Sequence, residues 1–371
     1  MSLVPTEIIF EVTNLNSSGE GSLAWAISQV NSYTGDLRPV VQIDSSLAGQ
    51  SIALSSAPTI SKPCVVRGNG VSITGYAIKT TAAVEWSDIT LPQITLSGAG
   101  ALSGENITLT SQRAVYLENW SSAADFSGIK TTAQDAYIGI SGTLGDSTFT
   151  QLPDTLPGGY RVVNDVTVAA GKTVTLEEGV CWKFDYKKSL FDYKESLYIY
   201  GTFVVNNATV ADALVADNNY VYCEVENGGK LQLTNANLKQ LYRVYLYSGG
   251  TLEMTGGTLD SRYELEVCAG ATATLTGVTV KDYINNYGCL TLEDCSINSY
   301  INNYGCLTLE DCSINKYINS EGTLKLTDVN STSYITAKGS TTLDGVTCTT
   351  LVVDGDADVS IGEKGIVLTG T

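Results

Sequence analysis

Residues 283–316 read YINNYGCLTLEDCSINSYINNYGCLTLEDCSINK, which is one 17-residue unit written twice. The two copies differ only at Ser299 and Lys316, and Tyr317 and Tyr334 begin two further, more divergent copies. A short fixed period means that one structural unit stacks on itself, because a unit this small cannot bury an apolar face alone. The repeat therefore decides the fold, whereas the function stays open, since solenoids serve as enzymes, adhesins and inert stalks.

Within each copy, apolar and polar residues alternate at the period of a β-strand. Leu290 and Leu292 alternate with polar residues, and Ile297 lies in a second short alternation. Asn285-Asn286 and Glu293-Asp294, which lie between such segments, are residue types that favour turns. No segment spaces apolar residues by three and four, as a helix would. The sequence therefore predicts a parallel β-helix with one coil per repeat.

A pair of apolar residues with the pattern Leu-x-Leu can be followed upstream of the repeats. The successive pairs are Val174/Leu176, Phe203/Val205, Leu231/Leu233, Leu252/Met254, Ala273/Leu275, Leu290/Leu292, Leu307/Leu309, Leu324/Leu326, Thr341/Leu343 and Val359/Ile361. Their spacing falls from 29 and 28 residues to 21 and then to 17, with 18 at the last step. We therefore expect an all-β solenoid whose coils narrow toward the C-terminus and whose wide upstream coils have room for loops.

The N-terminal segment predicts one helix followed by short strands. Ser22 is a suitable N-cap, and Leu23, Ala26, Ile27 and Val30 follow at helical spacing. Short β segments broken by Gly, Ser and Pro come next. They are expected at residues 40–43, 52–54, 65–67 and 72–74.

Residues 12–27, VTNLNSSGEGSLAWAI, together with Pro58, Ile60 and Gly68-Asn69-Gly70, carry a family resemblance. They resemble the N-terminal segment of bacterial surface proteins with right-handed parallel β-helices, a pectate-lyase-like superfold that includes autotransporter passengers and adhesins. Residues 159–184 are similar to coils of the same group. One departure is Ala24-Trp25, where the family usually has Arg. The resemblance implies a right-handed solenoid closed by an N-terminal capping helix, and a secreted or bacterial cell-surface location.

The domain organisation is expected to be one continuous solenoid. Residues 1–3 are interpreted as an expression scar, so the natural N-terminus, with any signal peptide, is expected to have been removed. Residues 4–145 are assigned to the cap and first coils, and residues 146–371 to the tapering coils, with the 17-residue repeats at 283–350. The formal net charge of −18 argues against nucleic acid or an anionic membrane as a partner. No apolar run approaches the roughly 20 residues of a membrane span.

Nine cysteines are present, and their spacing does not match a small disulfide scaffold. Cys295 and Cys312 lie at an inward phase that valine fills in later copies, so they are predicted to be core residues. Cys289 and Cys306 lie at an outward phase. Stacked neighbours have Cα atoms about 4.8 Å apart, which is within the range of a disulfide. A bridge and two free thiols are both compatible with this spacing.

Histidine is absent, which removes His-based triads, His-ligated metals and His acid–base catalysis. The signatures of β-helical pectin-degrading enzymes are absent as well. Catalysis would rest on carboxylates, and the candidates are Asp185 and Asp192 in a duplicated segment, and Asp212 and Asp217 between wide coils. A pair of them could act on a glycoside at a suitable separation. The alternative reading, which we favour, is that they are solvated turn carboxylates.

Five carboxylates are predicted to stack at one corner of the narrow coils. They are Glu293, Asp294, Glu310, Asp311 and Asp328. Like charges at this spacing repel one another by about 1 kcal/mol each in a water-like dielectric. Either the Asp side chains cap corner amides, or Ca²⁺ bridges the carboxylates. We favour capping, so no cofactor is expected, with Ca²⁺ as the alternative.

Tyr283, Tyr300, Tyr317 and Tyr334 each precede an isoleucine that should point inward, so the four tyrosines should form an exposed strip. Such a strip either binds something, with glycans or a host surface as the candidates, or stacks on itself and stiffens the rod. The sequence favours a non-enzymatic secreted or cell-surface protein, an adhesin or passenger stalk. The alternatives are a carbohydrate-active enzyme that uses carboxylates of the wide coils and a carbohydrate-binding module that uses the tyrosine strip.

Overall fold

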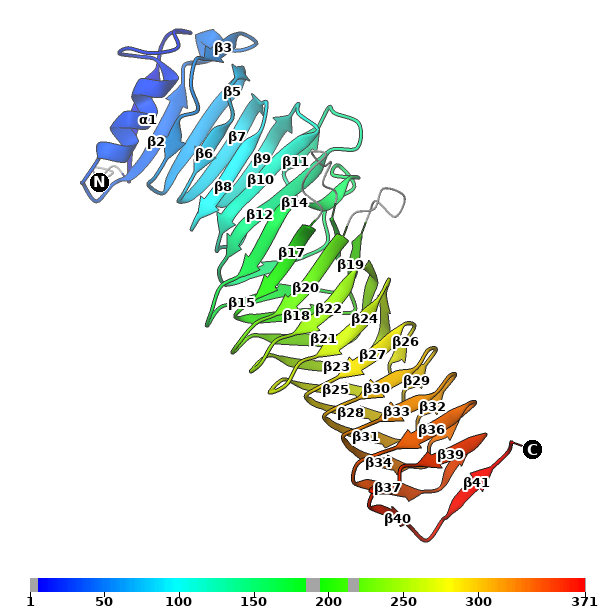
Figure 1. The fold of residues 1–371 in the computed structure, drawn as a ribbon. Coiled ribbons are helices and arrows are strands. Elements are labelled where there is room, and N and C mark those ends of the chain that lie inside the picture. Colours follow the sequence, from blue (N-terminus) through cyan, green and yellow to red (C-terminus); the bar gives the residue numbers. More distant parts are fainter. Residues whose placement is uncertain (1–5, 185–193, 213–219, 371) are drawn as a thin grey trace. The chain divides into compact units, whose positions relative to one another are not determined.

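The protein is an all-β parallel solenoid of about 15 turns (Figure 1). The computed structural model describes residues 6–184, 194–212 and 220–370, and within them it contains one α-helix. The chain divides into two compact units, Met1–Asn164 and Asp165–Thr371, which we describe separately.

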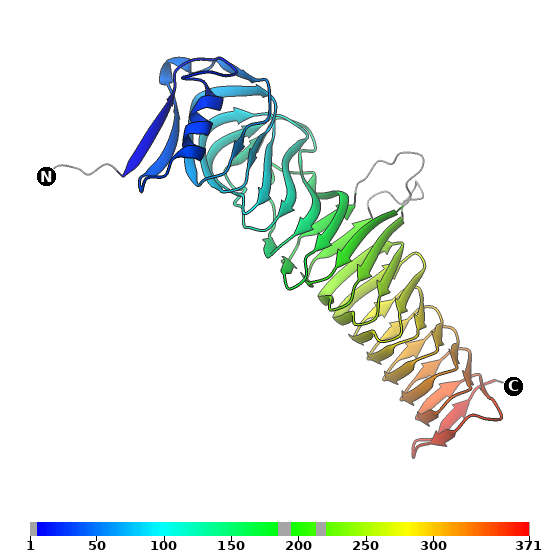
Figure 2. The ribbon, with the colours of Figure 1, turned by 60° about the vertical axis from the view of Figure 1, so that its left-hand side comes forward.

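The first unit begins with strand β1 (Glu7–Val12) and helix α1 (Leu23–Ser32). The helix starts where predicted, because the Ser22 hydroxyl accepts a hydrogen bond from the Trp25 amide at 3.2 Å. Its apolar face, including Leu23 and Ile27, is buried against β1, β2 (Arg38–Ile43) and β4 (Thr59–Ile60). Figure 2 shows α1 lying along the first strands of this unit. The helix therefore covers apolar side chains that no earlier coil could cover.

The other strands of the first unit form two parallel ladders. The first ladder contains β1, β2, β5 (Cys64–Gly75), β7 (Ala83–Leu91), β9 (Ala101–Leu109) and β11 (Ile129–Thr131), with β3 (Ser51–Leu54) also pairing with β5. The second contains β4, β6 (Ile78–Thr80), β8 (Ile94–Gly98), β10 (Arg113–Trp120) and β12 (Tyr137–Leu144), and β13 (Ser147–Phe149) follows. Side chains as large as Trp86 and Trp120 are fully buried between the ladders.

The second unit has three faces, each a parallel ladder with one strand per coil. We call them the tyrosine face, the leucine face and the third face. The tyrosine face contains β17 (Lys194–Ile199), β20 (Tyr220–Val225), β22 (Arg243–Leu246), β24 (Glu264–Val267), β27 (Tyr283–Asn286), β30 (Ile301–Asn303), β33 (Ile318–Ser320), β36 (Tyr334–Ala337) and β39 (Thr350–Val353). Residues 166–168 of β14 (Gly159–Val168) precede β17 on it.

The leucine face contains β15 (Thr173–Leu176), β18 (Thr202–Asn206), the first halves of β21 (Lys230–Leu241) and β23 (Thr251–Ser261), β25 (Thr272–Thr276), β28 (Cys289–Glu293), β31 (Cys306–Glu310), β34 (Thr323–Thr327), β37 (Thr341–Asp344) and β40 (Val359–Ile361). The third face contains β16 (Cys181–Phe184), β19 (Thr209–Asp212), the second halves of β21 and β23, β26 (Thr279–Val280), β29 (Ser296–Ile297), β32 (Ser313–Ile314), β35 (Asn330–Ser331), β38 (Val346–Cys348) and β41 (Ile366–Leu368).

The register of the leucine face confirms the predicted taper. Each Leu-x-Leu pair lies opposite the next one along the chain, from Val174 opposite Phe203 to Thr341 opposite Val359. The spacings of the pairs are therefore the lengths of the coils, which narrow to 17 residues.

The predicted inward positions are buried. Ile284, Ile301, Ile318 and Ile335 have no exposed surface, and Cys295 and Cys312 are only 2% and 3% exposed. The prediction that Asn285-Asn286 forms a turn is wrong. Both residues belong to β27, and Asn286 points inward with 0% exposure because its amide group finds hydrogen-bond partners inside the coil.

Three of the predicted catalytic candidates, Asp185, Asp192 and Asp217, lie outside the described residues. The backbone of Asp212 ends β19, and its side chain is also outside the description. In the part of the chain that the structure describes, no helix is long and apolar enough to cross a membrane.

Candidate functional site

The four predicted tyrosines form a continuous stack on the outer side of the tyrosine face, which we call the tyrosine ladder. The ring centroids of Tyr283, Tyr300, Tyr317 and Tyr334 follow one another at 4.8, 4.7 and 4.9 Å, with interplanar angles of 11°, 8° and 3°. The residues are in register because each follows the same phase of the coil. The ladder is thus about 14 Å long between its end rings.

The ladder rings are offset from one another. Carbon atoms in contact lie about 3.5–4.0 Å apart, so nearly parallel rings with centroids 4.7–4.9 Å apart must be displaced sideways. Each ring therefore covers only part of the face of its neighbour. Mutual stacking and contact with a ligand are compatible in this geometry.

A column of side-chain amides lies beside the tyrosine ladder, two residues further along each strand. Asn285, Asn302 and Asn319 are in register, and the Asn302 amide donates a hydrogen bond to the Asn285 side-chain oxygen at 3.0 Å. We call these three residues the asparagine column. All three are half-buried, so their remaining polar atoms lie at the floor of the face.

A second aromatic stack borders the asparagine column on the other side. Tyr287 and Tyr304, which we call the corner ladder, stack at 4.9 Å with an angle of 9°. They are 43% and 42% exposed, more than the ladder residue Tyr334 at 39%. In the next two coils the same phase carries Glu321 and Lys338, which form an ion pair at 2.9 Å. The corner ladder was not predicted, although Tyr287 and Tyr304 share the 17-residue period.

Upstream of Tyr283, the same columns carry charged residues, which we call the charged cluster: Arg243, Glu264 and Glu266. Glu264 is 4% exposed and lies opposite Tyr283. Its Oε2 accepts a hydrogen bond from the Asn285 amide at 2.6 Å. Its Oε1 lies 3.0 Å from Arg243 Nε without the alignment of a hydrogen bond, so this contact is an ion pair. Both carboxylate oxygens are thus occupied, and Glu264 is not a free base.

Three tyrosine rings surround Arg243. Its guanidinium carbon lies 5.6 Å from the ring centroids of Tyr242 and Tyr263 and 5.8 Å from that of Tyr245. Tyr242 and Tyr263 also contact each other at 4.5 Å. Cation–π contacts hold the Arg243 guanidinium in place, and its ion pair holds the Glu264 carboxylate. This cluster was not predicted, because the register of the wider coils does not follow from the 17-residue repeat.

Three tyrosines of the ladder remain neutral hydrogen-bonding groups. Burial and the nearby Glu264 carboxylate raise the pKa of Tyr283 to about 12. Burial also raises the pKa of Tyr300, with a further contribution from Glu264, and the pKa of Tyr317, with a further contribution from the neighbouring tyrosines. Each phenol therefore keeps its proton at physiological pH and can act as a donor and an acceptor.

At the carboxylate corner, the structure gives a backbone reason for aspartate. Asp294, Asp311 and Asp328 have positive φ angles of 53°, 51° and 51°, in the left-handed region. Gly277 and Gly345 occupy this position in the preceding and following coils, with φ of 65° and 68°. Asp and Asn tolerate this conformation better than most residues with a side chain. Glu293 and Glu310 lie in register beside them. Among the described residues, no group of three or more His, Cys, Asp or Glu side chains is placed to hold a metal ion.

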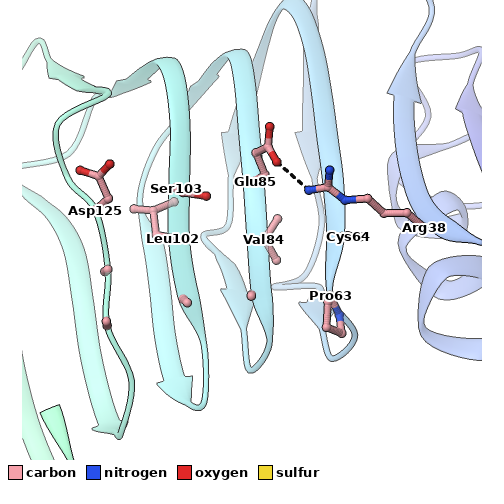
Figure 3. Close-up of a pocket in the computed structure, with 12 residues that line it drawn as sticks. Arg38, Pro63, Cys64, Val84, Glu85, Leu102, Ser103 and Asp125 are labelled. Carbon is pink, nitrogen blue, oxygen red and sulfur yellow. Dashed lines mark hydrogen bonds and ion pairs between the residues drawn. The ribbon is translucent and has the colours of Figure 1, made fainter. Parts of the chain in front are cut away.

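A groove of about 490 Å³ lies across β5, β7 and β9 of the first unit (Figure 3). Its charged groups are engaged with one another or with the backbone. Arg38 pairs with Glu85 at 2.6 Å, and the Asp125 carboxylate accepts the Ser127 amide, which lowers the pKa of Asp125. Burial raises the pKa of Cys64 to about 12, so its thiol stays protonated. Among the described side chains that line the groove, Arg38, Glu85 and Asp125 thus already have partners, and Cys64 keeps its proton.

The tyrosine face, in contrast, combines two aromatic stacks, a polar floor and a charged end on one continuous sheet. Comparisons of the chain with protein-family models, with curated proteins and with solved structures found no match.

Proposed function

We propose that this chain is a non-enzymatic secreted or cell-surface protein of the adhesin or passenger type, and that its tyrosine face binds glycan chains. The observation that carries the proposal is the arrangement of the tyrosine ladder, the asparagine column and the corner ladder side by side on one outer face. Tyr287, Tyr304 and Tyr334 are exposed on this face and the other three rings are half-buried, and a cluster of exposed aromatic side chains often marks a contact site.

The chemistry of the face suits a sugar chain laid along the solenoid axis. Uncovered parts of the tyrosine rings pack against the apolar faces of sugar rings, while phenol hydroxyls and asparagine amides hydrogen-bond to sugar hydroxyls. Such a site has the mixture of apolar contact and a few directed polar groups that is typical of ligand sites. Because the groups repeat every coil, the ligand should itself be a repeating chain.

The charges of the molecule favour a neutral glycan. The formal net charge is −18, and the end of the face nearest Tyr283 carries Glu264 and Glu266. A polyanionic chain would be repelled by this field. The proposed ligand class is therefore neutral polysaccharide.

The proposed cell-surface location rests on composition and on the N-terminal resemblance. Charged residues make up only 16% of the chain, and residues 12–27 resemble the capping segment of β-helical bacterial surface proteins. Membership in the pectate-lyase-like or autotransporter groups is part of the same proposal.

A glycan array, followed by calorimetry with the best neutral oligosaccharide, tests the proposal. Tyr287→Ala combined with Tyr304→Ala should weaken binding about tenfold or more, because exposed aromatic anchors dominate such contacts. Tyr76→Ala is the matched control, since Tyr76 is 54% exposed and belongs to the first unit. Equal loss in both variants, or no glycan bound at all, would overturn the assignment of the site.

The non-enzymatic part of the proposal has its own test. Incubation with neutral and acidic polysaccharides should release no product over the level of a boiled control. If product is released, and if Asp212→Asn or Asp185→Asn abolishes that release, the non-enzymatic proposal is wrong. The alternative, a carboxylate-dependent carbohydrate-active enzyme, would then take its place.

A further inference from the structure

Two cysteines on the outer side of the leucine face lie directly opposite each other. Cys289 of β28 and Cys306 of β31 are register partners in the parallel ladder. Both are exposed, whereas the other seven cysteines are buried or half-buried. All nine cysteines belong to the described residues, and none is in a disulfide there.

The distance between the two positions suits a covalent bond. Paired strands lie about 4.8 Å apart, and disulfides join Cα atoms that are roughly 4.4–6.8 Å apart. The register places the two cysteines side by side on the outer side of one ladder, and the neighbouring Cys306 thiol, followed by burial, raises the pKa of Cys289. The pair is therefore preorganised as neighbouring thiols.

The surroundings favour a bond within one molecule. Gly288 and Gly305 precede the two cysteines, and a Cβ atom at either position would collide with the backbone of the coil before it. The amide of Cys289 donates a hydrogen bond to the Ala271 carbonyl at 3.0 Å, and the amide of Cys306 donates one to the Gly288 carbonyl at 2.8 Å. These bonds hold the backbone of both cysteines in the ladder. Neither cysteine can move far from the other without breaking the ladder.

We propose that Cys289 and Cys306 are a dithiol modification site, at which a disulfide oxidant closes an inter-coil crosslink. This inference is independent of the proposed glycan binding. The crosslink joins two successive coils two residues beyond Tyr287 and Tyr304, so it also fixes the spacing of the corner ladder.

The reaction proceeds by two thiol–disulfide exchanges. The thiolate of one cysteine attacks a sulfur of the oxidant, for example oxidised glutathione, and expels one thiolate. The second cysteine then attacks the protein sulfur of this mixed disulfide and expels the other thiolate. The protein loses two protons and two electrons, and the oxidant takes up both and leaves as two molecules of thiol.

The buried pair in the same two coils provides a matched control. Cys295 and Cys312 have the same 17-residue separation, but both point into the core. The chain itself shows which replacements these positions accept, because Thr323 follows Cys306 in register and Val329 and Val346 fill the inward phase. Cys289→Thr and Cys306→Thr test the site, and Cys295→Val with Cys312→Val is the control.

The experiment treats the folded chain with oxidised glutathione and counts reactive thiols with DTNB before and after. Wild type and the Cys295→Val/Cys312→Val control should lose two reactive thiols and two hydrogens in mass, stay monomeric on non-reducing gels, and melt several degrees higher. Cys289→Thr and Cys306→Thr should instead each keep one thiol that accepts glutathione. Two thiols that remain reactive after oxidation, or a disulfide-linked dimer, would overturn the proposal.

Discussion

At the scale of single residues, neighbouring asparagines of the repeat have opposite environments. Asn303 is fully buried and accepts the Asn286 amide at 2.7 Å. It donates to the Ser320 hydroxyl and to the Thr323 carbonyl, each at 2.9 Å. This buried chain of amides pairs its polar groups with one another inside the core, except for the Asn286 side-chain oxygen, which has no hydrogen-bond partner.

Asn303→Ala should therefore lower the free energy of unfolding by about 1–3 kcal/mol, because it strands buried donors and acceptors. Urea denaturation measures the loss. Asn302→Ala is the control, since Asn302 is half-buried on the outer side, and surface changes of this kind usually stay within about 0.5 kcal/mol. Equal losses in the two variants would mean that the amide chain inside the coil contributes no special stability.

A second residue-scale prediction concerns Asp282, at the corner just before Tyr283. Burial, followed by the nearby Asp260 carboxylate, raises the pKa of Asp282 from 3.8 to about 6, and Lys281 opposes the shift. A carboxyl whose folded pKa is raised binds protons more tightly in the native state. Its contribution to stability therefore falls as pH rises from about 4 to about 6.

Asp282→Asn should be more stable than wild type at pH 7, and this advantage should shrink as pH falls through about 6 and vanish below about pH 3, where the wild-type carboxyl is protonated in the folded and in the unfolded chain. Thermal melts across this pH range check the difference. An advantage that is constant with pH would point to packing, not to titration, as its cause.

At the scale of structural elements, the corner that joins β31 to β32 needs a left-handed residue. Asp311 has φ of 51° there, and its amide donates to the Thr327 carbonyl at 3.0 Å. The left-handed conformation destabilises a residue that has a Cβ but no polar side chain to hydrogen-bond locally by about 1–2 kcal/mol. Asp311→Ala should thus be destabilised by about 1 kcal/mol, whereas Asp311→Gly should melt close to wild type.

The same pair of variants separates this explanation from a calcium site. If Ca²⁺ bridged the corner carboxylates, CaCl₂ would raise the melting temperature of wild type, and Asp311→Gly would lose that rise. We expect the melting temperatures of wild type and Asp311→Gly to be equally insensitive to CaCl₂.

The elements also show what the sequence reveals and what it hides. Strand phase was predictable because Ile284 and Leu290 belong to a periodic apolar pattern that only one register can bury. The inward position of Asn286 was not predictable, because a polar residue at this place indicates a turn. Only the structure shows that the Asn286 amide has partners inside the coil, Asn303 and the Cys306 carbonyl. Likewise, Arg243 and Glu264 are 21 residues apart and become neighbours only through the coil length.

At the scale of the whole molecule, stability in the second unit should be distributed coil by coil. Each strand of a narrow coil pairs only with the strands one coil before and after it, as β28 does with β25 and β31. The stability of such a stack is approximately a sum of coil and nearest-neighbour terms. Removing a whole coil then removes one term and leaves every other contact in register.

Deletion of residues 300–316 should therefore give a folded protein with a slightly lower melting temperature, because Tyr317 then follows Ser299 as Tyr300 does now. The shorter deletion of residues 300–311 removes fewer atoms but shifts the inward pattern out of phase, so it should be far more destabilising. Circular dichroism melts compare the two. Glycan affinity should fall in the first variant, since the tyrosine ladder loses one of its rings. If the shorter deletion melted higher, the coils would not be the units of stability.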